Sequence, residues 1–225
     1  MRNRVAVLIP AYNAVRWIGG IVSESRRHLA DVFVVDDGSV DGTGEVAAAA
    51  GAVLLRHEVN RGKGAALKTG FARILADGFD AVITLDADGQ HLPAEIPRFA
   101  AEAEKHDAAL VIGSRRHLFP GMVKRRRLAN SFSAWTISAA SRVSIPDSQS
   151  GFRLYTAELL RRLRIDANGF DAESEVIVRA GRMGFRIVSI PIELGFVDGV
   201  ATSHYRPLAD TIRIAFRVVR TVLRS

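Results

Sequence analysis

Residues 81–91 read AVITLDADGQH, a short apolar run followed at once by two aspartates that are one residue apart. Residues 81–86 have the composition of a buried strand, so the carboxylates of Asp86 and Asp88 are expected beyond its carboxyl end. Two carboxylates this close repel each other unless a cation lies between them. Mg²⁺ and similar hard cations accept one or two carboxylates and complete their shell with water and phosphate oxygens. The stretch therefore indicates a divalent-metal site for a phosphorylated ligand, although a lone D-x-D is also common in ordinary loops.

Strands and helices alternate in the first half of the chain. Apolar runs predict strands at residues 5–10, 32–36, 53–56, 81–86 and 108–113, and helical patterns predict helices at 15–29, 41–50, 64–76 and 94–105. Such alternation predicts an α/β fold with a mostly parallel sheet and helices on both faces. Ligands of these sheets bind beyond the carboxyl ends of the strands, which is where Asp86 and Asp88 lie.

The alternation stops after residue 115. The second half predicts a basic loop, a helix from about 127 to 141, a short strand at 150–155, a helix at 172–182, a strand at 186–194 and a final helix at 207–223. We find no internal repeat, low-complexity tract or linker. We therefore predict a single domain over residues 1–225, with two halves that divide near residue 115.

Composition narrows the range of partners. The chain has 225 residues, no cysteine, a formal net charge of +7 and a pI near 10.5, so its surface attracts polyanions. No stretch reaches the roughly 18 apolar residues of a membrane span, and the apolar start predicts a first strand and not a signal peptide. A nucleic-acid-binding module is a poor match, because aromatic residues are only 7% and none lies within the basic run 124–127. The lack of thiols agrees with a cytoplasmic protein.

Two segments of the second half combine basic and apolar residues. The run Lys124, Arg125, Arg126 and Arg127 follows the apolar Leu118, Phe119, Met122 and Val123. This mixture favours a lipid–water boundary over a plain solvated charge run. The predicted last helix places Arg213, Arg217, Arg220 and Arg224 on one face. It is either a helix docked on the core with a basic outer face or a helix that lies on an anionic membrane.

Other predicted strand ends also carry polar residues. Asp36 directly follows an apolar strand and suits a base or ribose, whereas Asp37, Ser39 and Asp41 can equally serve as local turn and cap residues.

Two basic clusters lie at further strand ends. The glycines around Lys63 precede a predicted helix, where backbone N–H groups can approach a phosphate, although glycine turns before helices are common. Arg115 at the end of the fifth strand offers a guanidinium for phosphate oxygens, or simply faces solvent.

His91, beside the D-x-D, is either a metal ligand or a hydrogen-bonding neighbour of the ligands.

A family resemblance covers most of these motifs. In order, the chain carries IPAYN (9–13), VVDDGSVDGT (34–43), NRGKGAALKTG (60–70), LDADGQHLP (85–93), GSR (113–115), DSQSGFR (147–153) and FDAE (170–173). These resemble the motifs of family-2 glycosyltransferases, and within that family the dolichyl- and polyprenyl-phosphate hexose synthases. The resemblance implies a GT-A, Rossmann-like fold, a nucleotide-diphosphate sugar and Mg²⁺ or Mn²⁺. It also implies inverting transfer of a mannose- or glucose-type hexose to a polyprenyl phosphate at the inner face of a membrane.

The resemblance also assigns roles to residues. It implies nucleotide-sugar-binding residues at Pro10, Ala11, Tyr12, Asn13, Asp36, Asp37, Lys63, Asp86, Ala87 and Arg153. It implies metal ligands at Asp86, Asp88 and Gln90, and acceptor-phosphate residues at Arg115, Arg126, Arg127 and Ser150. It also implies catalytic roles for four residues: Asp88, Arg115, Asp171 and Glu173. The first half of the domain then binds the nucleotide, and the second half faces the acceptor and the membrane.

Two departures from the family pattern leave alternatives open. Ala14 stands where the family usually has an acidic residue, so the donor base is not implied. The two-helix anchor that is common in the family is missing from this sequence, so we expect peripheral attachment through a surface helix, a membrane-protein partner or a homo-oligomer. A lipid phosphate is already anionic and needs no base, whereas transfer to a hydroxyl of a soluble or cell-envelope polysaccharide would need Asp171 or Glu173 as one.

Overall fold

The computed structural model describes residues 4–121, 124–195, 217–218 and 221–222, and the side chains of 119–126 lie outside this description. In this part of the chain seven strands form one sheet, in the order β3-β2-β1-β4-β6-β5-β7. The strands are β1 (Val5–Ala11), β2 (Val32–Asp36), β3 (Val53–Arg56), β4 (Ala81–Thr84), β5 (Leu110–Ser114), β6 (Arg153–Thr156) and β7 (Ile187–Pro191). All pairings are parallel except those of β6 with β4 and β5, which confirms the mostly parallel sheet.

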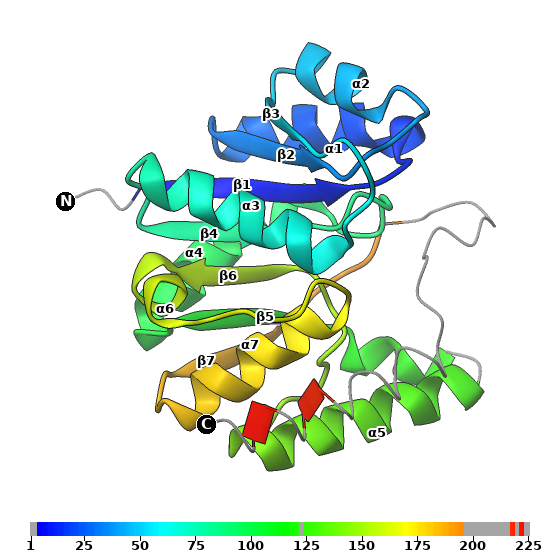
Figure 1. The fold of residues 1–225 in the computed structure, drawn as a ribbon. Helices are drawn as coiled ribbons and strands as arrows, with labels where there is room; N and C mark the ends of the chain where they lie inside the picture. The colour runs from blue at the N-terminus through cyan, green and yellow to red at the C-terminus, as the bar shows by residue number, and fades with distance from the viewer. Residues whose placement is uncertain (1–3, 122–123, 196–216, 219–220, 223–225) are drawn as a thin grey trace.

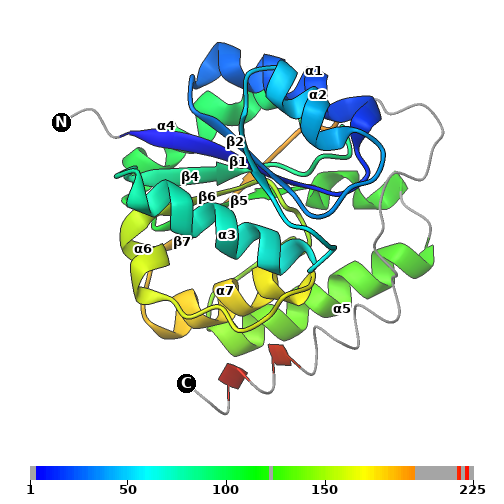
Figure 2. The ribbon, with the colours of Figure 1, turned by 45° about the horizontal axis from the view of Figure 1, so that its top comes forward.

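The helices cover both faces of this sheet (Figure 1). They are α1 (Val15–His28), α2 (Thr43–Ala49), α3 (Lys63–Ala76), α4 (Ile96–His106), α5 (Lys124–Ser141), α6 (Ala157–Arg162) and α7 (Asp171–Arg182), with 3₁₀ turns η1 (Pro93–Glu95) and η2 (Arg116–Gly121). One buried apolar cluster joins the sheet to α3, α5, α6 and α7, and a second joins it to α1, α2 and α4. Figure 2 shows α3 and α7 side by side on the first of these faces.

Each cluster follows from the sequence pattern of its elements. β2 and β5 are buried along their whole length, as expected for strands that are covered on both faces. The helix α1 turns Ile18, Ile21 and Val22 to the core, at the spacing of one helix face. No helix among the described residues is long and apolar enough to cross a membrane.

Several sequence expectations were wrong in detail. The strand β4 ends at Thr84 and not at Asp86, so both aspartates lie in the loop beyond it. The helix α5 begins at Lys124, which places the basic run in its first turn instead of in a loop, because lysine and arginine are good helix formers. The short helix α6 was not expected. Most of the predicted helix 207–223 lies outside the described residues. Within it the structure describes only residues 217–218 and 221–222, and these are helical.

Candidate active site at the carboxyl edge of the sheet

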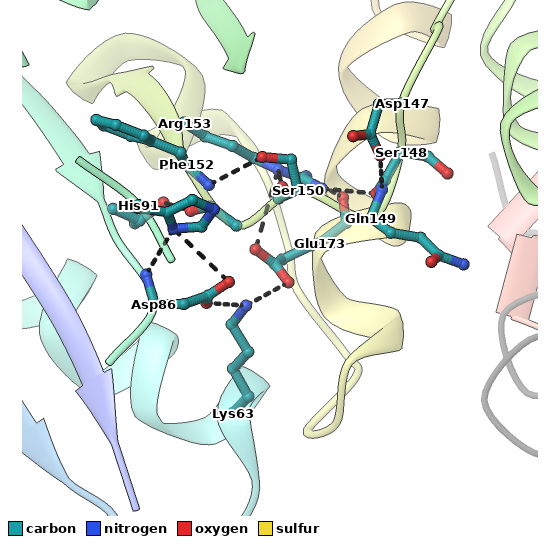
Figure 3. A network of polar contacts seen from close by, with 12 residues as sticks. Lys63, Asp86, His91, Asp147, Ser148, Gln149, Ser150, Phe152, Arg153 and Glu173 are labelled. Atoms are coloured by element: carbon teal, nitrogen blue, oxygen red, sulfur yellow. Dashed lines mark hydrogen bonds and ion pairs between the residues drawn. The ribbon is translucent and has the colours of Figure 1, made fainter. Parts of the chain in front are cut away.

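The centre of the edge is an ion-pair network between three elements (Figure 3). Lys63, the first residue of α3, places Nζ 2.5 Å from Oδ1 of Asp86 and 2.9 Å from Oε2 of Glu173. Asp86 follows β4, and Glu173 lies in the first turn of α7. Lys63 is 14% exposed and Glu173 only 6%, so these charges interact with little screening by water. The network brings together three residues that the sequence assigned to separate motifs.

The pKa values of the two aspartates of the D-x-D shift in opposite directions. Burial is the largest single effect on Asp86 and raises its pKa, but the charge and hydrogen bond of Lys63, together with weaker effects of neighbouring groups, lower this pKa to about 2. The pKa of Asp88 is raised by its burial and by the negative charge of Asp86. Lys63 and Arg115 act on Asp88 as well, but they lower its pKa by less than burial and Asp86 raise it.

His91 makes a hydrogen bond to the backbone of Asp86. Its Nδ1 accepts a hydrogen bond from the backbone N–H of Asp86, at 3.1 Å, and its ring packs against Phe152. Burial lowers the pKa of His91 to about 4, so the ring is neutral at pH 7. Of the two interpretations open from the sequence, this geometry favours the hydrogen-bonding neighbour.

The aspartates fit a divalent cation through their chemistry. Among the described residues no group of three or more His, Cys, Asp and Glu side chains could hold a metal by itself. Mg²⁺, however, is usually held by one or two carboxylates together with substrate phosphates and water. Asp86 and Asp88 supply the carboxylates, and the pKa of Asp88 is raised by its burial and by the negative charge of Asp86, which a divalent cation would offset. Gln90, which follows on the same loop, donates its backbone N–H to Oδ1 of Asp88, at 3.0 Å.

Asp37 organises the loop before α3. Its Oδ1 accepts the N–H of Arg61 and its Oδ2 the N–H of Gly62, at 2.9 and 2.8 Å. His57 places Nδ1 2.6 Å from Oδ1 of the same carboxylate. Asp37 is thus buried in a local network that holds the start of α3 and Lys63 in place. His57 was not singled out from the sequence, and its place directly after β3 was the available signal.

The ends of β1 and β2 are joined by hydrogen bonds. Asn13 donates its N–H to Oγ of Ser39 and accepts the N–H of Val40 at Oδ1. Asp41 accepts the N–H groups of Val15 and Thr43, which is the local capping role that the sequence left open for it.

The remaining predicted nucleotide residues lie at the same edge. Asp36 is buried beside Arg56, whose Nε lies 3.2 Å from its Oδ2. Pro10 and Ala11 end β1, and Tyr12 is 38% exposed directly after it. Ala87 is buried between the two aspartates of the D-x-D.

Arg115 is anchored by a carboxylate that was not predicted. Nε of Arg115 lies 2.8 Å from Oδ2 of Asp147, and Nη2 lies 3.2 Å from Oδ1. Burial alone would raise the pKa of Asp147, but Arg115 outweighs it and lowers this pKa. The signal was present in the sequence, because Asp147 is the one acidic residue between Asp107 and Glu158.

Arg153 and Ser150 lie deeper than the resemblance implied. Both are 0% exposed. The guanidinium of Arg153 donates to the backbone carbonyls of Ser148, Ser150 and Glu173, at 2.7–2.8 Å. The structure thus places Arg153 as a link between the 148–150 loop and α7, with its polar atoms directed at the backbone and not at the open edge.

Asp171 is also paired. Nε of Arg217 lies 2.8 Å from its Oδ2, which brings the C-terminal segment to the start of α7. The predicted phosphate ligand Arg127 is half-buried in the first turn of α5. The Arg126 side chain, and Arg213, Arg220 and Arg224, lie outside the described residues.

A mostly parallel sheet with a carboxylate pair beyond its central strand defines an α/β protein whose ligand site lies at the carboxyl edge of the sheet. The sequence profile of "Glycosyl transferase family 2" matches residues 6–164, and the chain therefore belongs to this family.

Individual relatives agree with this assignment. The chain is 33% identical to an undecaprenyl-phosphate mannosyltransferase of Micrococcus luteus over 203 residues, which covers 84% of this chain and 82% of the relative. It is 36% identical to a polyprenol monophosphomannose synthase of Mycolicibacterium smegmatis over 209 residues, with 84% and 77% covered.

Solved structures confirm the GT-A fold. Glucosyl-3-phosphoglycerate synthase of Mycobacterium tuberculosis, with phosphoglyceric acid bound, superposes with a TM-score of 0.74 at 22% identity and covers 99% of this chain and 80% of its own. The same enzyme with Mn²⁺ and uridine-diphosphate-glucose bound gives a TM-score of 0.71 at 23% identity, and the match covers 99% of this chain and 79% of that chain.

Proposed function

We propose that this chain transfers a mannose- or glucose-type hexose, with inversion, from a nucleotide-diphosphate sugar to a polyprenyl phosphate at the cytoplasmic face of a membrane. The observation that carries this proposal is the Asp86–Asp88 pair beside Lys63 at the carboxyl edge of a GT-A sheet. The names of the two relatives above support the lipid acceptor.

Asp86, Asp88 and Gln90 would hold a Mg²⁺ or Mn²⁺ ion, which stabilises the negative charge of a leaving diphosphate. Around it, Asp37 fixes the loop of residues 60–62 that precedes Lys63, so that a cation and the N–H groups at the start of α3 face the same edge. This arrangement favours binding of an anionic donor.

Arg115 is placed to orient the acceptor phosphate. Asp147 engages Nε and Nη2 of the guanidinium, which leaves the donors of Nη1 for a phosphate oxygen. A fixed guanidinium loses little conformational freedom when it binds, and it aligns the acceptor for attack on the anomeric carbon.

No dedicated base is needed for a phosphate acceptor, which is already anionic at pH 7. The two carboxylates that could act as one are both held by cations, Asp171 by Arg217 and Glu173 by Lys63. We propose that they position these cations instead of removing a proton.

An exposed apolar face on α5 supports attachment to a membrane surface. Leu128, Phe132 and Trp135 follow one another at helical spacing and are 67%, 53% and 68% exposed. The rings of Phe132 and Trp135 lie 6.1 Å apart. Arg142 follows the end of α5, where it lines a cavity of about 230 Å³ with Arg179, Arg182 and Met183. Exposed aromatic residues on a helix that also carries cations suit an anionic lipid interface.

The experiment combines purified protein, Mn²⁺ or Mg²⁺, polyprenyl phosphate in vesicles and a panel of radiolabelled nucleotide sugars. We expect label in the lipid fraction, and we expect Asp88→Ala to abolish it and to weaken metal-dependent nucleotide binding. An absence of lipid product, together with unchanged nucleotide affinity in Asp88→Ala, would overturn the proposal.

The same assay separates a phosphate acceptor from a hydroxyl acceptor. Asp171→Asn and Glu173→Gln should reduce transfer to the lipid phosphate only in part. A polysaccharide hydroxyl would instead require one of these carboxylates as base, and its substitution would then abolish transfer.

A further inference from the structure

The Lys63 ammonium occupies a position where a metal ion would also be attracted. It lies 2.5 Å from Oδ1 of Asp86, one of the two carboxylates of the D-x-D, and it comes from a different element, α3. Gly62 precedes Lys63 with φ +94°, a conformation that side chains rarely adopt. The backbone turn that directs Lys63 to the edge is therefore built into the chain.

A divalent cation and this ammonium cannot both hold Asp86 at short range without strong repulsion, because little water separates the charges. Lys63 has a second partner that a metal need not disturb, since its Nζ is also 2.9 Å from Oε2 of Glu173. Its four-carbon stem is flexible, so the ammonium can leave Asp86 and keep Glu173. A diphosphate at the same edge would add new anionic oxygens for the ammonium to bind.

We propose that Lys63 is an internal cation that competes with the metal for Asp86 until a nucleoside diphosphate draws it away. This inference rests on the proposed function, because it assumes that the edge binds a metal–nucleotide pair. Its consequence is that metal and nucleotide bind cooperatively: each raises the affinity of the other by the same factor, as linkage requires.

The test measures Mn²⁺ binding by electron paramagnetic resonance, with and without a nucleoside diphosphate, in the wild type and in Lys63→Met. Without nucleotide we expect the variant to bind Mn²⁺ about tenfold more tightly than the wild type, since its competitor is gone. We also expect the gain in Mn²⁺ affinity on adding nucleotide to be at least about threefold smaller in the variant than in the wild type, since the direct contact of the ion with the diphosphate remains in both.

Lys68→Met is the matched control. Lys68 lies on the same helix, and its Nζ contacts Oδ1 of Asn168 instead of the aspartates. This variant removes the same charge from α3, and it should leave Mn²⁺ affinity and the cooperativity near wild-type values. Lys63→Gln repeats the test if the methionine variant does not fold, and Lys63→Arg, which keeps the charge, should restore weak Mn²⁺ binding.

The outcomes separate this inference from the proposed function. If the wild type binds the Mn²⁺–nucleotide pair but Lys63→Met and Lys63→Gln leave both quantities unchanged, or match Lys68→Met, the inference is overturned and the proposed function stands. If the wild type binds neither Mn²⁺ nor nucleotide, both fall. If the metal results are as expected but no sugar reaches a lipid, the inference is supported and only the proposed acceptor is wrong.

Discussion

Arg217 holds Asp171 through an ion pair of 2.8 Å between Nε and Oδ2. Asp171 is in the first turn of α7, where a carboxylate is favoured by the helix dipole, and its side chain is 4% exposed. Arg217 belongs to the row of arginines that the sequence placed on one helix face. At this position the arginine is turned toward a buried carboxylate, whereas the sequence interpretation of a docked helix placed the arginines on its outer face.

Arg217→Ala should destabilise the protein, because it leaves the buried carboxylate of Asp171 without its charged partner. We expect a loss of about 1–3 kcal/mol in the free energy of unfolding, measured by urea denaturation. Arg161→Ala, on the exposed face of α6, is the control and should change stability by less than about 0.5 kcal/mol. Equal effects of the two substitutions would contradict the structural role of the Arg217 pair.

Gly151→Ala should damage the metal site more than the fold. A Cβ at this position would lie 2.5 Å from both carboxylate oxygens of Asp86, so the carboxylate must move. We expect Mn²⁺ affinity in the presence of nucleotide to fall at least about tenfold, a cost of about 1.4 kcal/mol, measured by calorimetry.

Gly20→Ala is the matched control for that substitution. Gly20 lies within α1 and a Cβ there meets nothing within 4 Å, so the change should stabilise the protein by about 0.5–1 kcal/mol and leave Mn²⁺ binding unaltered. If Gly151→Ala binds Mn²⁺ as tightly as Gly20→Ala does, the position of the Asp86 carboxylate does not affect Mn²⁺ binding, and the prediction is wrong.

The Arg115–Asp147 pair should contribute to acid unfolding. Burial raises the pKa of Asp147, but the charge of Arg115 and the hydrogen bonds from Arg115 and Gln149 together lower it below 3.8 in the folded protein. The stability from this pair is therefore fully present above pH 3.8 and is lost as the pH falls through the lowered pKa.

Asp147→Asn removes that charge and leaves the guanidinium of Arg115 buried without its counter-ion. At pH 7 we expect a loss of about 3–5 kcal/mol in the free energy of unfolding. The difference between the variant and the wild type should shrink when urea unfolding is repeated near pH 3. A constant difference across this range would show that the charge of Asp147 does not stabilise the fold.

The α5 face should determine binding to anionic membranes. Trp135→Glu and Phe132→Glu place charge on the exposed face, and we expect each to reduce co-sedimentation with phosphatidylglycerol vesicles at least about fivefold. Val53→Glu, a change of the same kind on the edge strand β3, should bind as the wild type does. Binding that persists in the α5 variants would exclude this face as the membrane-contacting surface.

Part of the site was predictable because it depends on local sequence. The run before Asp86 has strand composition, and the alternation of strands and helices predicts parallel strands whose carboxyl ends share one edge. The hydrogen bond from Thr43 to Asp41 was also predictable, because the two residues are close in sequence at the start of α2, whereas the bond from Val15 depends on the tertiary structure. The predicted start of α5 was wrong because a run of charged residues is typical of a loop, whereas lysine and arginine also have a high helix propensity.

By itself, the sequence determined the order of the strands and of most helices, the mostly parallel sheet and the edge that carries the aspartates, since hydrophobic periodicity is a local property of the chain. Only the tertiary structure decided which charges face each other. Lys63 meets Glu173 because α3 and α7 pack on the same face of the sheet, and Asp147 meets Arg115 although the helix α5 lies between them in the chain. An ion pair depends on distance in space and on burial, and neither can be read from the positions of two residues along a chain.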